Sequence, residues 1–276
     1  MNAVLHGVIR YAVVIGGSLI IGTGALAQNL GTIFSDLWWN PAESGWGVTI
    51  DHQQDVMFLT FFIYRADNST YWVTATLQKV GTTGLATSPQ IFTGDLAETR
   101  GPSFGVPFNP NSVTARKVGT ATFTATAGNA ATLQYSVDGV NVTKNIQRQT
   151  LRNVNFTGPY LGGTIYTFFG CVNPANNNTV IQDSGILNIF HSGASFRIVA
   201  QGQFAVCTFN GTYSQTGRLG NVNGGTYSCT DGTIGTFSMN TLEWTVMGMS
   251  GLVTGQNQFC QFSGYFGGIT NAHLTP

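Results

Sequence analysis

Apolar and polar residues alternate along much of the chain, most clearly before residue 150. In residues 120–126 every second residue is Thr and the residues between are Ala or Phe, and residues 131–137 and 140–147 follow the same period. A period of two is typical of a strand with one buried face and one wet face. Asp138-Gly139, between the last two segments, is a strong hairpin signal. The pattern predicts a meander of three antiparallel strands.

Earlier residues predict further strands of the same sheet. Residues 46–51 alternate, and after a short turn residues 56–65 are apolar at nearly every position. A strand that is apolar on both faces is expected to be covered on both faces. After a turn at residues 66–69, the alternation resumes over residues 70–77. Residues 81–117 are less regular, so we expect a long connection around one strand.

The second half of the chain carries an aromatic–x–Gly pattern at irregular spacing, for example at Phe209 and Phe262. We interpret these glycines as bends in curved strands, with aromatic side chains filling the interior. The sequence thus predicts an all-β protein of two small antiparallel meander domains, each an up-and-down barrel or a sandwich. We place the N-terminal domain at residues 28–152 and the C-terminal domain at residues 153–276.

The first 27 residues have the features of a secretory signal peptide. Arg10 precedes an apolar stretch over residues 11–24, and residues 25–27 read Ala-Leu-Ala, a small-x-small cleavage pattern. The stretch is shorter than the roughly 20 residues of a membrane-spanning helix. We therefore expect a secreted or periplasmic protein without a transmembrane span after cleavage; an uncleaved anchor is the alternative.

Composition narrows the possible partners. Only 8% of the residues are charged, whereas aromatic residues make up 12% and there are 36 glycines, which favours sheets and tight turns over disorder. Lys and Arg number 11 and so do Asp and Glu, so the chain has no excess of positive charge. A nucleic-acid-binding surface needs clustered cations, and we therefore expect no nucleic-acid partner.

Four cysteines lie in the second half of the chain: Cys171, Cys207, Cys229 and Cys260. An even number in an exported chain favours disulfides, and no spacing here is typical of a zinc site. If the stretch between Cys207 and Cys229 folds back at Arg218, these two cysteines oppose each other, as do Gly211 and Gly225. The remaining cysteines would form the second disulfide. Two other pairings stay open.

Residues 37–47, LWWNPAESGWG, resemble the W-W-N-P-x-E-S-G-W-G opening of a group of exported bacterial proteins. The segments HQQD, FFIYRADNSTYW and GPSFGVPFNP are similar to later segments of that group. The resemblance covers about residues 37–150. It implies an exported β domain and carries no catalytic residue across. Residues 68–70, Asn-Ser-Thr, stand where the group has a Gly-x-Pro turn.

The same motif is the best candidate ligand site. We expect Trp38, Trp39 and Trp46 to form an aromatic wall with Glu43 as a polar group, which suits a glycan or a small apolar ligand. The alternative is that these tryptophans close one end of a barrel while Glu43 pairs with a cation. Trp72 lies on the wet face of its strand, as an exposed platform or beneath a covering loop or domain.

Two cations, Lys144 and Arg148, lie on the face of their predicted strand that otherwise carries apolar residues. An inward cation must be paired or lie near a barrel mouth. A buried pair of Lys144 with Glu43 or Asp51 is one interpretation, and a position at the open end with the amine in water is the other.

Catalytic patterns are weak. Ser44, His52 and Asp55 can be named as a triad, but Ser44 does not lie in a G-x-S-x-G turn. Paired carboxylates are limited to Glu43 with a nearby Asp, or Glu243 beside Trp244. We assign no catalytic residue, metal site or cofactor. The leading hypothesis is an exported, non-enzymatic binding or surface-interaction protein; the alternatives are a secreted hydrolase with Glu43 as acid or base, and a structural envelope or matrix component.

Overall fold

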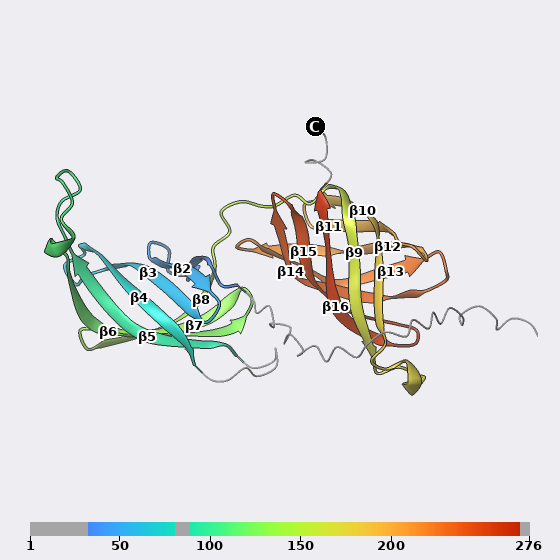
Figure 1. Cartoon of the computed structure of the whole chain (residues 1–276), viewed down its shortest axis with the longest axis horizontal. Helices are drawn as coiled ribbons and strands as arrows, with labels where there is room; N and C mark the ends of the chain where they lie inside the picture. The colour runs from blue at the N-terminus through green and yellow to red at the C-terminus, as the bar shows by residue number, and fades with distance from the viewer. Residues whose placement is uncertain (1–32, 81–88, 271–276) are drawn as a thin grey trace, which may run out of the picture. The chain divides into compact units, whose positions relative to one another are not determined.

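The computed structural model describes residues 33–80 and 89–270, which form two closed, antiparallel, eight-stranded barrels in sequence order (Figure 1). The all-β prediction with two meander domains is confirmed, and both domains are barrels. The predicted boundary between residues 152 and 153 falls between the last strand of the first barrel and the first strand of the second. The predicted signal peptide, residues 1–27, lies outside the described residues.

The first barrel has eight strands: β1 (Asp36–Trp39), β2 (Gly47–Gln53), β3 (Val56–Tyr64), β4 (Thr70–Val80), β5 (Ile91–Arg100), β6 (Thr114–Ala127), β7 (Ala130–Val137) and β8 (Val140–Arg148). Each strand pairs with the next, and β8 pairs with β1 to close the barrel. The predicted three-stranded meander is β6–β8. Its hairpin turn has positive φ at both Asp138 (46°) and Gly139 (86°), as a type I′ turn requires.

The second barrel also has eight strands: β9 (Gly158–Phe169), β10 (Val180–Ser192), β11 (Ser195–Gln201), β12 (Val206–Thr216), β13 (Leu219–Cys229), β14 (Ile234–Thr245), β15 (Gly248–Asn257) and β16 (Gln261–Thr270). Closure is between β16 and β9. Short 3₁₀ turns at Pro110–Ser112 and Pro174–Asn176 lie in the connections before β6 and β10. The two barrels therefore share one strand order.

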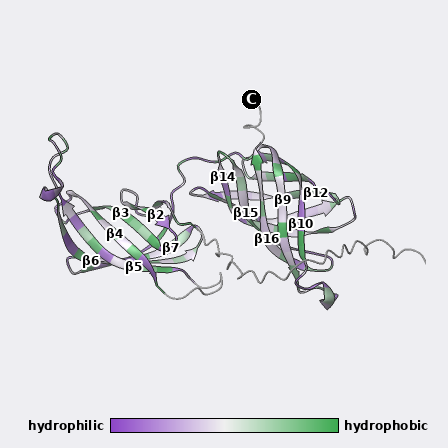
Figure 2. Cartoon of the chain, viewed as in Figure 1, coloured by the Kyte–Doolittle hydropathy of each residue, from purple (hydrophilic) through white to green (hydrophobic). Residues whose placement is uncertain are grey.

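Hydrophobic and polar positions alternate along many strands, and the inward positions make up a separate core in each barrel (Figure 2). The expectation that residues 56–65 are covered on both faces is wrong. Met57, Leu59 and Phe61 of β3 are buried, whereas Phe62 on the outer face is 51% exposed. A single barrel offers only its interior to a strand, so the outward aromatic residues remain at the surface.

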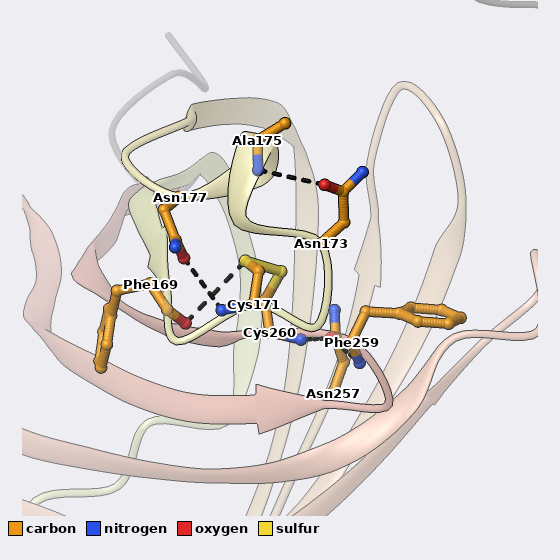
Figure 3. Close-up of a disulfide and its surroundings, with 8 residues drawn as sticks. All are labelled: Phe169, Cys171, Asn173, Ala175, Asn177, Asn257, Phe259 and Cys260. Carbon is orange, nitrogen blue, oxygen red and sulfur yellow. Dashed lines mark hydrogen bonds between the residues drawn. A yellow bond between two sulfur atoms is a disulfide. The ribbon is translucent and has the colours of Figure 1, made fainter.

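Both predicted disulfides are confirmed, and each joins neighbouring strands or their ends. Cys207 pairs with Cys229 across β12 and β13, and Cys171, after β9, bonds to Cys260, before β16. Beside the Cys171–Cys260 disulfide, the backbone N–H of Cys171 donates to Asn177 Oδ1 (2.9 Å), as Figure 3 shows. Disulfides of this kind are typical of an oxidising compartment.

The predicted pairing within β12 and β13 holds only near the disulfide. Asn210 faces Thr226, but the next pair is Thr212 with Asn223, so the register shifts. The predicted opposition of Gly211 and Gly225 falls at this shift: the two glycines lie close together, with Gly225 Cα 3.4 Å from a Cβ built on Gly211, but they are not a regular pair of the ladder. One extra residue on β13 forms a bulge, which bends the strand and changes the pairing beyond it.

One end of each barrel is closed by a phenylalanine and a histidine. In the first barrel the N–H of Phe34 donates to His52 Nδ1 (3.1 Å), and His52 Nε2 lies 2.7 Å from the Gln54 carbonyl. In the second barrel, Phe156 N–H donates to His191 Nδ1 (3.3 Å), and His191 Nε2 lies 3.0 Å from the Gly193 carbonyl. Because a carbonyl only accepts, each Nε2 carries the proton and each Nδ1 accepts.

The closing contacts extend to a second aromatic residue four positions after each phenylalanine. Trp38 Nε1 donates to the Phe34 carbonyl (2.9 Å), and the Tyr160 hydroxyl donates to the Phe156 carbonyl (3.0 Å). Phe34 and Phe156 are fully buried. Each barrel is thus closed at the end where its second strand finishes, and any opening into the interior lies at the opposite end.

Candidate functional site

The interior of the second barrel contains a cavity of about 310 Å³. It is lined by inward residues of the core and by residues at the strand ends opposite His191, among them Gln201, Cys207 and Cys229. An eight-stranded barrel is just wide enough to be filled by its own side chains or to hold one small ligand. The cavity volume lies at the lower end of the range of about 300–1,000 Å³ that is typical of small-molecule sites.

Five aromatic rings form a continuous wall of this cavity, which we call the aromatic wall: Tyr166, Phe168, Phe209, Tyr227 and Phe262. Ring centroids along this series lie 5.3 Å apart for Phe168–Tyr166, 5.2 Å for Tyr166–Phe262, 6.1 Å for Phe262–Tyr227 and 5.0 Å for Tyr227–Phe209. The rings come from β9, β12, β13 and β16. Aliphatic side chains line much of the remainder: Leu187, Ile198, Met239 and Val253.

The wall carries two phenol groups. Tyr227 is only 8% exposed and lines the cavity. Burial raises the pKa of Tyr227 to about 12, and burial followed by the charges of Asp183 and Asp231 raises the pKa of Tyr166. Both groups are therefore neutral phenols near pH 7.

Two carboxylates belong to the lining at the open end. Asp183 lies near the start of β10, and its Oδ1 accepts from the backbone N–H groups of Ser184 (2.9 Å) and Gln203 (2.8 Å). Asp231 lies in the turn before β14, and its Oδ1 accepts from Thr233 N–H (2.9 Å). Neither forms an ion pair with another described residue. None of the described lining residues is Lys, Arg or His.

The corresponding end of the first barrel has a different character. A depression of about 700 Å³ is lined by a charged cluster around Glu98. This buried carboxylate accepts hydrogen bonds from Arg116 (2.9 Å), Arg65 (3.0 Å) and Arg100 (3.3 Å), and Arg116 also binds Asp138 (2.6 Å). The hydrogen bond from Arg116 is the largest cause that lowers the pKa of Glu98. Each of the three guanidinium groups is paired with Glu98, so the cluster is held together by its own ion pairs.

The predicted wall of three tryptophans is not formed, because Trp38 belongs to the barrel core. Trp38 is fully buried and packs edge-on against Phe123, with centroids 5.3 Å apart. Trp46 is half-buried, and Trp39 keeps a buried Nε1 without a partner in the described structure. Adjacent residues of a strand point to opposite faces, so Trp38 and Trp39 cannot line the same surface. Trp72 is 54% exposed, which fits the platform interpretation.

Glu43 has the partners that the alternative interpretation expects. Its Oε2 accepts from Trp46 Nε1 (2.9 Å), and its carboxylate forms an ion pair with Lys144 (2.8 Å), with both side chains partly exposed. The hydrogen bond from Lys144, aided by that from Trp46, lowers the pKa of Glu43. A carboxylate held in this way is unsuited to act as a general acid near pH 7.

Arg148 is the other inward cation, and it is fully buried. Its guanidinium donates to Asp36 Oδ2 (3.0 Å) and to the carbonyls of Ile33 (2.6 Å), Ser35 (3.1 Å) and Gly128 (2.9 Å). The expectation that an inward cation must be paired therefore holds for Arg148. These contacts tie the start of β1 to the end of β8, where the barrel closes.

Catalytic and metal chemistry finds little support in the described residues. Both ring nitrogens of His52 are engaged by backbone groups, so none is left to activate Ser44. Within the described ranges, no group of three His, Cys, Asp or Glu side chains could hold a metal ion.

Among those same residues, no helix is long and apolar enough to cross a membrane.

Comparison with known proteins adds no relative. No protein-family model matches the chain, and neither a curated protein nor a solved structure matches it. The site must therefore be judged by its own geometry. Sequence reasoning missed the cavity of the second barrel, although the aromatic–x–Gly pattern singled out Phe209 and Phe262 of its wall.

Proposed function

We propose that the protein is an exported binding protein that holds one small, largely apolar ligand inside the second barrel. The observation that carries this proposal is the cavity of about 310 Å³ with its aromatic wall. The aromatic rings do not fill the interior of the barrel. Replacing water in the remaining space with an apolar ligand is therefore favourable for binding. The two disulfides and the predicted signal peptide support a site of action outside the cytosol.

The hydrolase alternative receives less support. Glu43 is ion-paired with Lys144 and lies in the first barrel. Retaining or inverting hydrolysis of a glycan needs a second carboxylate across a cleft and one carboxyl group that keeps its proton. The lowered pKa of Glu43 works against the proton-donor role.

A neutral fluorescent probe, N-phenyl-1-naphthylamine, tests the proposal directly. We expect saturable binding with one site per chain, seen as a rise in probe fluorescence. Ala200→Phe should abolish it, because Ala200 lines the cavity and a phenyl ring there occupies the ligand's volume.

The matched control is Val199→Phe, one residue earlier on β11, where the alternation places the side chain on the outer face. This variant should bind the probe as the wild type does. Absence of saturable binding to the wild-type protein, or equal binding by the Ala200→Phe variant, would overturn the proposal. Circular dichroism of both variants checks that the barrel is intact.

A further inference from the structure

We infer that the ligand of the second barrel is a cation, namely an apolar or aromatic amine or quaternary ammonium whose positive group lies at the mouth near Asp183 and Asp231. This inference rests on the proposed function, since it specifies the chemical class of ligand for the same cavity. It follows from the charge at the mouth, the aromatic faces and the phenol groups, which are independent features of the lining.

The charge at the mouth is wholly negative. The domain from residue 153 to residue 276 contains two cationic Lys or Arg side chains, Arg197 and Arg218. Arg218 pairs with Glu243 (3.4 Å), and Arg197 lies over the ring of Phe190, 5.2 Å from its centroid, on the outer face of β10. Neither belongs to the cavity lining. Asp183 and Asp231 thus present two carboxylates with no counter-charge of the protein beside them.

An apolar cavity strengthens the effect of these carboxylates. Charges that face a space with low-dielectric walls act over a longer distance than charges in bulk water, so the field at the mouth attracts cations and repels anions. A neutral apolar ligand would leave both carboxylates as they are. A cationic ligand would neutralise them while its hydrocarbon part enters the cavity.

The aromatic wall supplies the second recognition element. A cation over the face of a tyrosine or phenylalanine ring is attracted by the ring quadrupole. Tyr166 and Tyr227 line the same cavity as Asp183 and Asp231, and the charge of Asp231 adds to the effect of burial in raising the pKa of both tyrosines. Rings and carboxylates therefore converge on one region of the lining, as in sites that bind alkylated ammonium groups.

The phenol of Tyr227 supplies the third element. Tyr227 lines the cavity and is only 8% exposed, and the oxygen of its neutral hydroxyl can accept a hydrogen bond from an ammonium N–H. A bare metal ion fits this lining less well. Two carboxylates and two phenols lie beside an apolar space, and no set of three ligating side chains occurs among the described residues.

Three compounds that share one ring system test the inference: 2-naphthylmethylamine, 2-naphthylmethanol and 2-naphthoate. Displacement of the neutral probe gives the affinity of each at pH 7. We expect the amine to bind at least about tenfold more tightly than the alcohol, in keeping with one charge-assisted contact and one cation–π contact, and the carboxylate to bind most weakly. Of the three compounds, only the amine should bind more weakly at higher salt concentration, because salt screens its attraction to the carboxylates.

Asp183→Asn and Asp231→Asn provide the decisive variants, since an amide keeps the oxygen that accepts the backbone N–H groups. The double variant should lose most of the preference for the amine, because only the cation–π contact remains, and should keep its affinity for the alcohol. Asp51→Asn, an exposed carboxylate of the first barrel, is the matched control and should change nothing. Equal binding of amine and alcohol by the wild type would overturn the inference and leave the proposed function intact. Failure of all compounds, the neutral probe included, would instead overturn the proposed function.

Discussion

The two disulfides of the second barrel are predicted to contribute unequally to its stability. Cys207 and Cys229 close a loop of 22 residues, whereas Cys171 and Cys260 are 89 residues apart. With the inner disulfide formed, the outer loop shortens to about 68 residues. The loop-entropy relation then gives about 3.4 kcal/mol for the inner bond and about 4.4 kcal/mol for the outer one.

The variants Cys207→Ala/Cys229→Ala and Cys171→Ala/Cys260→Ala test this difference of about 1 kcal/mol. Differential scanning calorimetry assigns the transition of the second barrel as the one that a reducing agent shifts in the wild-type protein. We expect a lower Tm for that transition in both variants, and a value about 4 °C lower still in the variant without the outer bond. Cys260 is also buried, so its truncation adds to the cost in the same direction.

A larger loss from removing the inner bond would refute the loop-entropy reasoning, since no burial difference favours that order. A shift of the first-barrel transition in either variant would also contradict it, because both bonds lie between residues of the second barrel.

Two further expectations concern the first barrel. Trp38→Ala should destabilise it by about 3–5 kcal/mol because a fully buried indole is removed from the core, whereas the exposed Trp72→Ala should change stability by less than about 0.5 kcal/mol; urea unfolding compares the two, and equal losses would place Trp38 outside the core. Burial lowers the pKa of His52 below its ordinary value of 6.5, so the unfolded chain binds a proton first and the barrel loses stability as the pH falls below about 6.5. Urea midpoints at pH 8 and pH 5 measure this loss, and it should shrink in His52→Gln; a loss that is unchanged in this variant would assign the effect to other groups.

Several features of the fold were accessible from local pattern. Alternation over residues 120–147 identified β6–β8, and the Asp138-Gly139 turn set the register of β7 against β8. The same reasoning paired Cys207 with Cys229, because a hairpin brings residues at equal distance from its turn face to face. The predicted pairing failed between the bulge at Gly224 and the hairpin turn. One inserted residue shifts the register, but in a short strand it does not visibly change the alternation of apolar and polar residues.

The closing contacts were hidden because their spacing differs between the barrels. Phe34 and His52 are 18 residues apart, whereas Phe156 and His191 are 35 apart. Longer first and second strands and a longer connection between them in the second barrel account for the difference, so no fixed-period repeat marks the two copies. Equivalent positions become visible only when the strands are paired.

The alternation of apolar and polar side chains depends on neighbouring residues only, and the sequence by itself therefore determined the all-β class, the strands β6–β8 with their Asp138-Gly139 hairpin, and the pairing of Cys207 with Cys229 as the favoured one of three. Which of the two faces of a strand points inward depends on what the strand packs against. For a strand as short as β1, the sequence pattern could not show that Trp38 points into the core. The meeting of Asp183, Tyr227 and Asp231 was likewise decided by the closure of β16 on β9, which curves eight strands around one space. Such closure depends on contacts between distant segments and on the volume their side chains leave unfilled, and neither is encoded in any local stretch.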